Sequence, residues 1–591
     1  MPDQMTSAQP IGDVPAAIES AYDDYLRAFL EITRRAKTVF ERQNWMEGQE
    51  NIRERLDLYD ASLEAIIGAL RDCHGTGILS RHNWKSYKQG FYRRISTRED
   101  IDLAESFYNS VTRGIFHTVG IDRELEFFHL HESDVMHEDS VAVYRSYVVD
   151  GETQPVVARM LRESGLSAEF ENLDRDAERV SQEIDLRLWP IKASDAPFVI
   201  QIIDSFFFRN KVAYAVGRIL SDARCLPLAI PLYSGGDGMY VDTVLLDEED
   251  VDVVFSFAFS SFHVDIVSHH SLISFLHSIL PHKPVSELYS SIGFDRYAKT
   301  IFYRNLHRFV HLSKETFEIA PGKEGAVMTC FTLPSFDFVF KIIKDKPCFV
   351  RSGMQTAKEI TRDAVIARYD FVCHRDRVGR LVDTQEFENL RFKEKRFRPE
   401  LLDEFALVAH RAIEIRDGSV ILRHCFVQRK VTPFPIFLRE EKDPEKIRRV
   451  VIDFGFFIKD LAGTGIFPSD LFNTWNYGVT SYARVVLFDY DDVLPLEDVQ
   501  FRIKPEPRDD FERAAPEEEW IVSGPDDFFI DEMNLFSGVP SPLKGIFLSV
   551  HSDLYTLEFW RSMKDKLNRG ELADIYPYSR QKRFVNRHHL V

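Results

Sequence analysis

The chain has 591 residues and a formal net charge of −20 at pH 7. This length exceeds what one hydrophobic core sustains, so two to four domains are expected. The hydrophobic fraction of 44% and the charged fraction of 28% are ordinary for a globular protein. The negative charge disfavours a general nucleic-acid binder, because contacts to phosphates need a basic surface.

Signals for secretion, membrane insertion and disulfide bonding are weak in this sequence. The six cysteines have no CxxC or His–Cys spacing, which argues against a zinc site or a disulfide framework and favours a reducing cytosol. The first ten residues lack a basic stretch followed by an apolar one, so no signal peptide is expected. No apolar run approaches the roughly 20 residues of a membrane span. We therefore expect a cytoplasmic protein with neither a membrane partner nor a nucleic-acid partner.

The N-terminal half is predicted to be mainly helical, with a mixed α/β part. Apolar and aromatic residues recur at helical spacing over 15–46 and over 50–73, which predicts two long antiparallel helices. Further helices are expected over 98–120, 175–188, 268–281 and 295–313. His269 and His270 have no partner at ligand spacing, so we interpret them as surface residues.

Strand-like segments lie among these helices between about 140 and 260. They cover 141–149, 196–204 and 239–246. The Gly-rich run 233–242 lacks the GxxxxGK[ST] pattern of a phosphate loop, and no helical pattern follows it. We interpret this run as a hairpin turn.

Helical periodicity gives way to strands near 314–322, where a domain boundary is expected. Gly322 and Gly325 in the sequence APGKEG lie where a hairpin could cover phosphates with backbone N–H groups, although this pattern is also an ordinary turn. Lys341 ends an apolar strand, as the lysine does in the VAIK strand of protein kinases. An inward lysine there needs an anionic partner; the alternative is a strand residue that faces solvent.

The elements that follow have the order of a kinase N-lobe and the start of its C-lobe. They are a helix over 356–373, strands over 378–384 and 387–392, a helix over 398–410, a strand and linker over 418–433 and a helix over 442–463. Asp383 lies between two of the predicted strands, where a lone carboxylate would be interpreted as a turn residue.

Residues 466–493, IFPSDLFNTWNYGVTSYARVVLFDYDDV, place Asp470, Asn476, Asp489 and Asp491 around one short strand. Phosphoryl transfer from ATP needs a carboxylate that faces the acceptor hydroxyl, and an amide and a second carboxylate on the metal that bridges the phosphates. Each carboxylate alone has a simpler interpretation as a turn residue or helix cap. The upstream strand with Lys341 favours the catalytic interpretation.

With these elements in order, the chain closely resembles the isocitrate dehydrogenase kinase/phosphatase family. The likeness spans nearly the whole chain, and FTLPSFDFVFKIIKD together with VDTQEFENL is highly specific. Other matching stretches are APGKEGAVMTC, VILRHCFVQRKVTP, IKDLAGTGIFPSD, NYGVT, RVVLFDYDD, FYNSVTRGIFHTVGID and ELYSSIGFDRYAKTIFYR.

The resemblance implies an α+β protein with a mainly helical regulatory domain (1–316) and a bilobal protein-kinase-like domain (317–591). The N-lobe would cover about 317–430 and the C-lobe about 431–591. Members of the family use ATP and Mg²⁺ to phosphorylate, and so inactivate, a serine of isocitrate dehydrogenase, and they also remove that phosphate. The balance directs carbon between the citric acid cycle and the glyoxylate bypass, and AMP is an allosteric effector. A homodimer is left open.

The resemblance also implies roles for individual residues. Lys341 matches the lysine that contacts the phosphates, Asp470 the catalytic carboxylate, and Asn476 and Asp489 the metal ligands. Asp383 matches a carboxylate tied to the phosphatase reaction. The nucleotide loop corresponds to Ala320, Pro321, Gly322, Lys323, Glu324, Gly325 and Ala326.

One departure from the kinase pattern leaves an alternative open. In HRDxxxxN the asparagine is the fifth residue after the aspartate, but Asn476 is the sixth after Asp470, and Asn473 is a rival ligand. Misplacement by about 1 Å can cost roughly 100-fold in rate. The second hypothesis is therefore a weakened kinase-like protein that binds nucleotide or isocitrate dehydrogenase without efficient turnover.

Overall fold

The structure is a computed structural model of the chain. Among the residues it describes, no helix is both long enough and apolar enough to cross a membrane. Lys323 and Glu324 of the predicted nucleotide loop lie outside the described residues. The described residues are 13–73, 79–129, 141–189, 196–221, 224–256, 261–322, 325–349, 358–375, 377–471, 473–516, 520–521, 524, 526–531, 533, 539–571 and 574–587.

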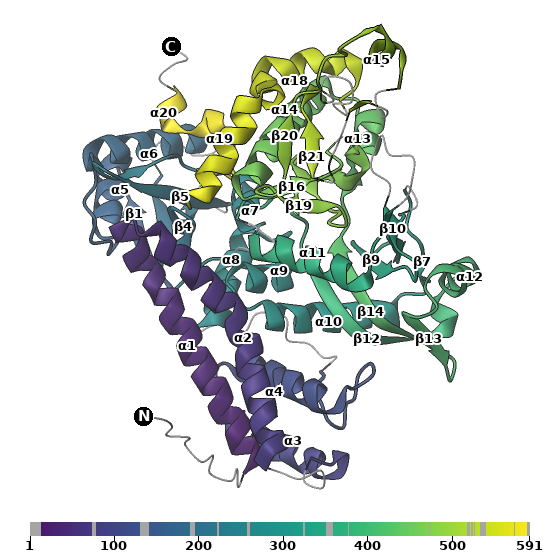
Figure 1. The fold of residues 1–591 in the computed structure, drawn as a ribbon. Helices are drawn as coiled ribbons and strands as arrows, with labels where there is room; N and C mark the ends of the chain where they lie inside the picture. Colours follow the sequence, from purple (N-terminus) through teal and green to yellow (C-terminus); the bar gives the residue numbers. More distant parts are fainter. Residues whose placement is uncertain are drawn as a thin grey trace, which may run out of the picture.

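The N-terminal part begins with the predicted pair of long antiparallel helices. Figure 1 shows this pair projecting from the rest of the molecule, with two shorter helices beside its far end. Tyr22 and Tyr25 pack against Phe107 from the fourth helix, so the aromatic stripe is core. The four helices are α1 (Val14–Arg42), α2 (Trp45–Cys73), α3 (Arg81–Ile95) and α4 (Ile101–Phe116).

An antiparallel sheet of six strands follows, in the order β1-β2-β4-β5-β6 with β3 paired to β4. Gly235 and Gly238 pair across the last hairpin, which confirms that the Gly-rich run is a turn. The strands are β1 (Tyr144–Val149), β2 (Phe198–Ile203), β3 (Phe207–Arg209), β4 (Val212–Ser221), β5 (Arg224–Gly235) and β6 (Gly238–Val241).

The two faces of this sheet belong to two different cores. Ile200 and Ala213 pack against α5 and α6 on one face, while Tyr214 and Val216 pack against the helical part of the chain on the other. Because both faces are covered, β4 and β5 are buried along most of their length. The helices of this region are α5 (Thr153–Arg162), α6 (Leu173–Leu188), α7 (Glu248–Phe255), α8 (His269–Ile279), α9 (Val285–Ser291) and α10 (Asp295–Leu312).

A second antiparallel sheet has the order β12-β14-β9-β8-β7, with β13 paired to β14. Tyr369 of α11 stacks on Phe426 of β14 at a ring distance of 4.2 Å, so this helix packs against the sheet. The elements are β7 (Glu318–Ile319), β8 (Met328–Thr332), β9 (Phe338–Ile343), β10 (Cys348–Phe349), β11 (Lys358–Glu359), α11 (Arg362–Arg375), β12 (Thr384–Lys393), α12 (Pro399–Val408), β13 (Ile413–Arg416) and β14 (Ser419–Arg429).

The segment 378–384 is not the predicted strand; most of it is a loop that leads into β12. Gly379 has a φ of 59°, which turns the backbone. Arg380 is buried and donates hydrogen bonds to Asp453 and Asp460, at distances of 2.6 to 2.8 Å. This ionic contact holds the loop against the next lobe instead of extending the sheet.

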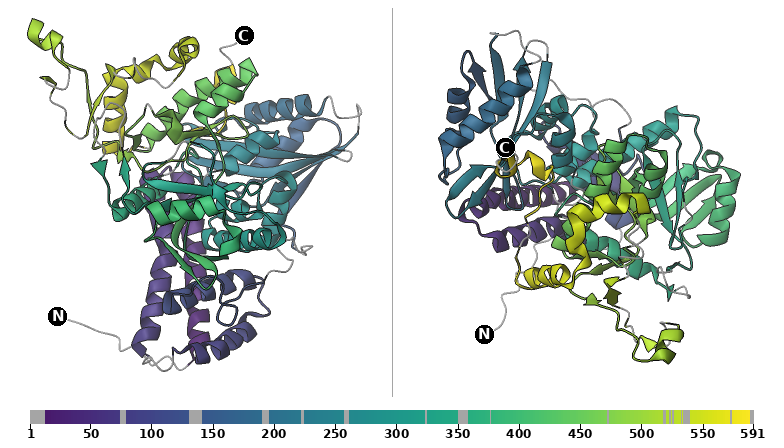
Figure 2. Two further views of the ribbon diagram at one scale, coloured as in Figure 1. Left: turned by 90° about the vertical axis from the view of Figure 1, so that its right-hand side faces the viewer. Right: turned by 90° about the horizontal axis from the view of Figure 1, so that it is seen from above.

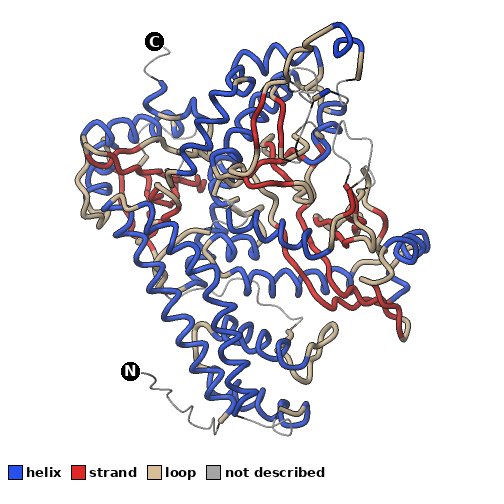
Figure 3. The backbone as a smooth tube through the Cα atoms, viewed as in Figure 1, coloured by secondary structure: helices blue, strands red, loops and turns tan. Residues whose placement is uncertain are grey.

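The C-terminal lobe is mainly helical and carries several short strand pairs, which Figure 3 shows apart from the two larger sheets. Its core surrounds Phe454, Phe457 and Trp560. The elements are β15 (Thr432–Pro433), α13 (Phe434–Glu440), α14 (Pro444–Gly463), β16 (Ile466–Pro468), β17 (Tyr477–Val479), β18 (Val485–Leu487), β19 (Val493–Pro495), β20 (Gln500–Arg502), α15 (Asp510–Ala514), β21 (Asp527–Phe529), α18 (Lys544–His551), α19 (Leu557–Asn568) and α20 (Phe584–Arg587).

After this lobe the chain returns to the N-terminal sheet. Tyr578 donates to Asp242 at 2.8 Å, and Arg583 donates to both oxygens of the same carboxylate at 2.9 and 3.0 Å. Phe584 joins the core under β6. Figure 2 shows this yellow segment lying against the blue N-terminal sheet, so segments far apart in the sequence complete one structure.

Candidate active site

Lys341 lies on β9, where it pairs with Cys330 of β8 and with Phe426 of β14. Its side chain is buried, so the solvent-facing alternative is wrong. The ammonium group donates a hydrogen bond of 2.7 Å to the carbonyl of Phe488 and lies 5.2 Å from the centre of that ring. Because Phe488 immediately precedes Asp489, this lysine joins the two lobes at the predicted metal ligand.

Asp489 and Asp491 form a pair of carboxylates beside this lysine. The pKa of Asp491 is raised well above its usual value by burial and by the neighbouring charge of Asp489, while Lys341 acts in the opposite direction. One oxygen of Asp491, Oδ1, is buried and has no hydrogen-bond partner among the described residues. Arg368 of α11 donates to the backbone carbonyl of Asp491. The site therefore holds concentrated negative charge that a cation would relieve.

Two strand pairs position the remaining predicted residues. β16 pairs with β19, and β17 pairs with β18, so the loop that carries Asp470 and the loop that carries Asp489 run between the same strand pairs. Asp470 is buried. The amides of Phe488 and Asp489 both reach the carbonyl of Asn476, at 3.2 and 3.4 Å. These contacts place Asn476 directly beside Asp489.

The extra residue between Asp470 and Asn476 is absorbed by tight turns. The amide of Asn473 donates to the carbonyl of Asp470, and the amide of Asn476 donates to the carbonyl of Asn473, both at 3.0 Å. A short 3₁₀ turn (Thr474–Asn476) completes the loop. The side chain of Asn473 donates to the amide oxygen of Asn476 at 3.1 Å. Asn473, the alternative ligand, therefore orients the oxygen of Asn476.

The predicted nucleotide loop connects β7 and β8 of the N-lobe sheet. The amide of Ala320 donates to the carbonyl of Cys330 at 2.9 Å, which anchors the loop next to the strand that pairs with Lys341. Gly322 has a φ of 139°. A side chain at Gly325 would meet the carbonyl of Met328 at 2.7 Å. Both glycines are therefore required by the backbone path of the hairpin.

Asp383 is separate from this group and faces the N-terminal part of the chain. Its pKa is raised to about 7 by burial and by the nearby carboxylates Glu287 and Asp295. It lines two cavities whose lining includes none of Lys341, Asp470, Asn476 and Asp489. The backbone just before it is nonetheless tied to the catalytic loop, because the hydroxyl of Tyr490 donates to the carbonyl of Val382.

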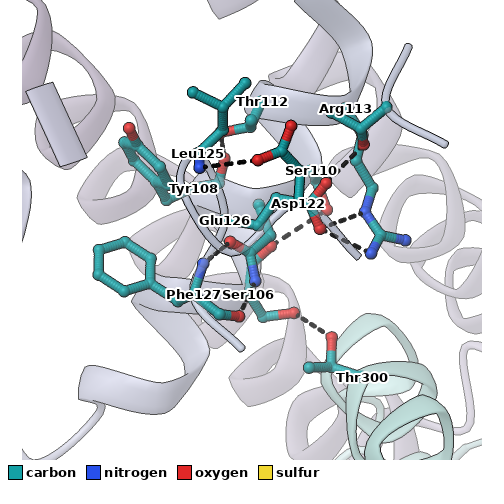
Figure 4. A network of polar contacts seen from close by, with 12 residues as sticks. Ser106, Tyr108, Ser110, Thr112, Arg113, Asp122, Leu125, Glu126, Phe127 and Thr300 are labelled. Atoms are coloured by element: carbon teal, nitrogen blue, oxygen red, sulfur yellow. Dashed lines mark hydrogen bonds and ion pairs between the residues drawn. The ribbon is translucent and has the colours of Figure 1, made fainter. Parts of the chain in front are cut away.

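The larger of these cavities, about 840 Å³ in volume, lies between the N-terminal helices and β12. Figure 4 shows part of its polar lining: Ser106 contacts Thr300 at 2.8 Å, and Glu126 holds Arg113 at 2.8 and 3.1 Å. Lys299 also lines it; burial and Arg296 lower the pKa of this lysine to about 8. The cavity therefore has the size to take a small ligand, and both basic and acidic side chains line it.

The donors at the junction of the lobes suit Mg²⁺, which prefers oxygen ligands and uses few of them from the protein. Asn476 offers an amide oxygen, and Asp489 and Asp491 offer carboxylates, one of which has a buried oxygen without a partner among the described atoms. An N-lobe sheet with an inward lysine, a mainly helical C-lobe and these oxygen donors between them define the class of protein-kinase-like phosphotransferases.

Comparison with known proteins gives the family. The regulatory-domain model of isocitrate dehydrogenase kinase/phosphatase (AceK) matches residues 15–314, and its kinase-domain model matches residues 315–580. The chain belongs to this family.

Similar proteins of that name extend over nearly the whole chain. The relative from Anaeromyxobacter sp. (strain Fw109-5) is 38% identical over 571 residues, covering 97% of each chain. The relative from Polaromonas sp. (strain JS666 / ATCC BAA-500) is 34% identical over 597 residues, covering 98% of this chain and 94% of the other.

Two residues of the site have no role in the sequence-based assignment. Asp491 is named there in the same motif as Asp489 but is not assigned as a ligand, and its burial and its partnerless oxygen among the described atoms now draw attention to it. Arg368 belongs to α11, 123 residues before the carbonyl that it contacts. No local signal in the sequence distinguishes this arginine from the others on its helix.

Proposed function

We propose that this protein phosphorylates and dephosphorylates isocitrate dehydrogenase, and so directs carbon between the citric acid cycle and the glyoxylate bypass. The observation that carries the proposal is the hydrogen bond from Lys341 to the carbonyl that precedes Asp489, which joins the two lobes at one site. The proposed substrate and direction of control come from the relatives, whose shared name is isocitrate dehydrogenase kinase/phosphatase.

In the kinase direction, Lys341 would hold the α- and β-phosphates of ATP under the hairpin that contains Gly322 and Gly325. Asp470 would orient the serine hydroxyl of the substrate and accept its proton. Asn476 and Asp489, with Asp491 beside them, would hold Mg²⁺, which when bound neutralises negative charge on the phosphates. The role of these residues is to hold the hydroxyl in line with the γ-phosphate.

In the phosphatase direction, we assign Asp383 a separate role. A carboxylate with a pKa of about 7 can exchange a proton at neutral pH, which suits a general base for water. Replacing Asp383 with alanine is expected to abolish release of phosphate and to spare phosphorylation. Equal loss of both activities would contradict this separation.

The experiment that tests the function follows label on and off purified isocitrate dehydrogenase. With [γ-³²P]ATP, the wild-type protein is expected to label the substrate, and to release the label after unlabelled nucleotide is added. Asp489→Asn is expected to lower labelling by about 1,000-fold, because the metal ion that binds the phosphates loses a charged ligand. ATP binding without labelling by the wild-type protein would favour the weakened kinase-like alternative.

We further propose that AMP, the expected effector, binds the 840 Å³ cavity between the N-terminal helices and β12. Lys299 supplies positive charge for a phosphate, Arg113 lies on the same lining with Glu126 as its partner, and Tyr59 and Tyr303 supply aromatic faces for a base. The cavity lies between the two matched domains, so a ligand there would contact both of them.

The pH dependence of AMP binding tests this assignment. Lys299, with a pKa of about 8, is charged below that pH and neutral above it, so AMP affinity is expected to fall by up to about 10-fold between pH 7 and pH 9. Calorimetry should show a weaker and flatter profile for Lys299→Met. Lys314→Met, a change beyond the end of α10 and outside the cavity lining, should match the wild type. A steep profile in Lys299→Met would contradict the assignment.

We also propose a cytoplasmic location. Cys225, Cys330, Cys348, Cys373 and Cys425 are free thiols, as a reducing compartment would keep them. The association of the chain into homodimers stays a prediction, and sedimentation of the purified protein would test it.

A further inference from the structure

Three side chains from distant parts of the N-terminal domain converge between α4 and α8. Asp102 lies in the first turn of α4, and His269 and His270 begin α8. His269 is 8% exposed and His270 is 25% exposed, so the interpretation of both as surface residues is wrong. One ligand atom from each of the three side chains lies within 4.8 Å of the other two.

The distances from the two imidazoles to the carboxylate are longer than those of strong hydrogen bonds, and the contact of His269 with Asp102 is a weak one. The Nε2 atoms of His269 and His270 lie 3.4 and 3.6 Å from the same oxygen, Oδ1 of Asp102. Hydrogen bonds from nitrogen to oxygen usually measure about 2.7 to 3.2 Å. By contrast, nitrogen and oxygen ligands at about 2.0 Å from a tetrahedral zinc ion are about 3.3 Å apart. The spacing fits donors arranged around an ion.

Two further observations support a ligand role. The second oxygen of Asp102, Oδ2, is buried and has no well-formed hydrogen bond among the described residues, although the hydroxyl of Tyr297 lies close to the same carboxylate. The other ring nitrogen of His270, Nδ1, contacts the hydroxyl of Tyr289 at 3.2 Å. Such a partner fixes the orientation of a metal-ligating imidazole.

We propose that Asp102, His269 and His270 form a binding site for a divalent transition-metal ion, with Zn²⁺ as the best match to two imidazoles and one carboxylate. Both helices begin at this point, so their dipoles oppose a cation there. The ionised carboxylate and the two coordinating nitrogens offset that opposition. A water molecule would complete the coordination.

The ion would join α4 to α8 next to the large cavity. Leu103, which follows Asp102, and Phe294, whose ring centre is 6.0 Å from that of His269, both line that cavity. The site is therefore a structural clamp on the wall of the cavity, and it is separate from the phosphate-transfer residues. The inference stands whether or not the cavity binds AMP.

The test uses the full-length protein after removal of metals with a chelator, in excess Mg²⁺ to occupy the carboxylates of the catalytic site. Calorimetric titration with Zn²⁺ is expected to show one tight site per chain, and Co²⁺ is expected to give visible absorption bands typical of a low-coordinate site. Asp102→Asn and His269→Asn should weaken Zn²⁺ binding by at least about 100-fold, and Tyr289→Phe by roughly 10-fold.

His277→Asn is the matched control, because it makes the same change on the same helix away from the cluster and should bind Zn²⁺ like the wild type. If circular dichroism shows that Asp102→Asn is misfolded, Zn²⁺ binding by His270→Asn tests the proposal instead. The side chain of His270 is the most exposed of the three, so this change disturbs the fold least. The absence of a tight site in the wild type, or unchanged binding in a correctly folded ligand variant, would overturn the proposal.

Discussion

A carboxylate that titrates near neutral pH lies where the two matched domains meet. Asp383 has its pKa raised to about 7 by burial and by the charges of Glu287 and Asp295. In an unfolded chain the same group titrates near about 3.9. The native protein therefore holds this proton more tightly than the unfolded chain, and the resulting stability is complete below about pH 4 and lost as pH rises through about 7.

Asp383→Asn should change how stability depends on pH. Asparagine resembles the protonated carboxyl but does not titrate, so the variant avoids the loss that the wild type suffers between pH 5 and pH 8. The free energy of unfolding of the variant, relative to wild type, is expected to rise by roughly 2 kcal/mol over that interval. Guanidinium denaturation at both pH values measures it. Parallel pH profiles for the two proteins would show that Asp383 does not hold the proton.

At the level of elements, the C-terminal lobe depends on a close approach of α14 to α18. A side-chain Cβ at Gly455 of α14 would lie 2.2 Å from the ring of His551 of α18. His551 is buried, and its Nε2 atom contacts the carbonyl of Ile452 at 2.8 Å. The two helices can pack at this distance only because glycine occupies the contact.

Gly455→Ala is therefore expected to lower the free energy of unfolding by about 1–3 kcal/mol through overpacking. Gly545→Ala is the matched control, since nothing lies within 4 Å of a Cβ at that position of α18. The control should be neutral or more stable by up to about 1 kcal/mol, because alanine favours helix. Urea denaturation compares them, and equal stability of the two variants would refute this explanation of the contact.

The elements differ in how well the sequence predicts them. α1 and α2 follow from a clear apolar stripe, because one face of each helix is buried and the other is exposed. The sequence does not predict β4 and β5: both faces of their sheet are covered, so their apolar residues do not alternate. The predicted strand over 378–384 fails because Arg380 finds its carboxylate partners only in the folded protein.

The same limit applies to the sites. Lys341, Asp470 and Asp489 lie in short motifs that resemble those of one family, so the resemblance singles them out although each residue alone has a simpler interpretation. His269 and its acidic neighbour Asp102 are separated by 167 residues, and no local pattern links them. Long-range pairing of this kind is decided by the packing of helices, which residue spacing does not encode.

For the whole molecule, ion pairs between distant segments hold the two halves together. Arg429, at the end of β14, binds both oxygens of Glu287 from α9 at 2.7 and 2.9 Å. Asp242 of the N-terminal sheet is 1% exposed and is held by Tyr578 and Arg583. The residues after the C-terminal lobe are thus part of the N-terminal core.

Asp242→Ala is expected to cost about 3 kcal/mol, because it leaves the partly buried Arg583 and the buried hydroxyl of Tyr578 without their shared partner. Asp237→Ala, in the exposed hairpin turn nearby, should change stability by less than about 0.5 kcal/mol. Differential scanning calorimetry measures both. Similar melting temperatures for the two variants would show that the C-terminal contact contributes little.

The contact between Asp242 and Tyr578 also bears on how the protein is made. The two residues are 336 positions apart, so a ribosome that adds about 5–20 residues per second releases the second roughly 15–70 s after the first. Throughout that interval the nascent first domain carries a carboxylate whose neutralising cation has not yet been synthesised. Maturation of the earliest domain therefore waits for translation of the last, and a prematurely terminated chain would present this domain unfinished to cellular proteases.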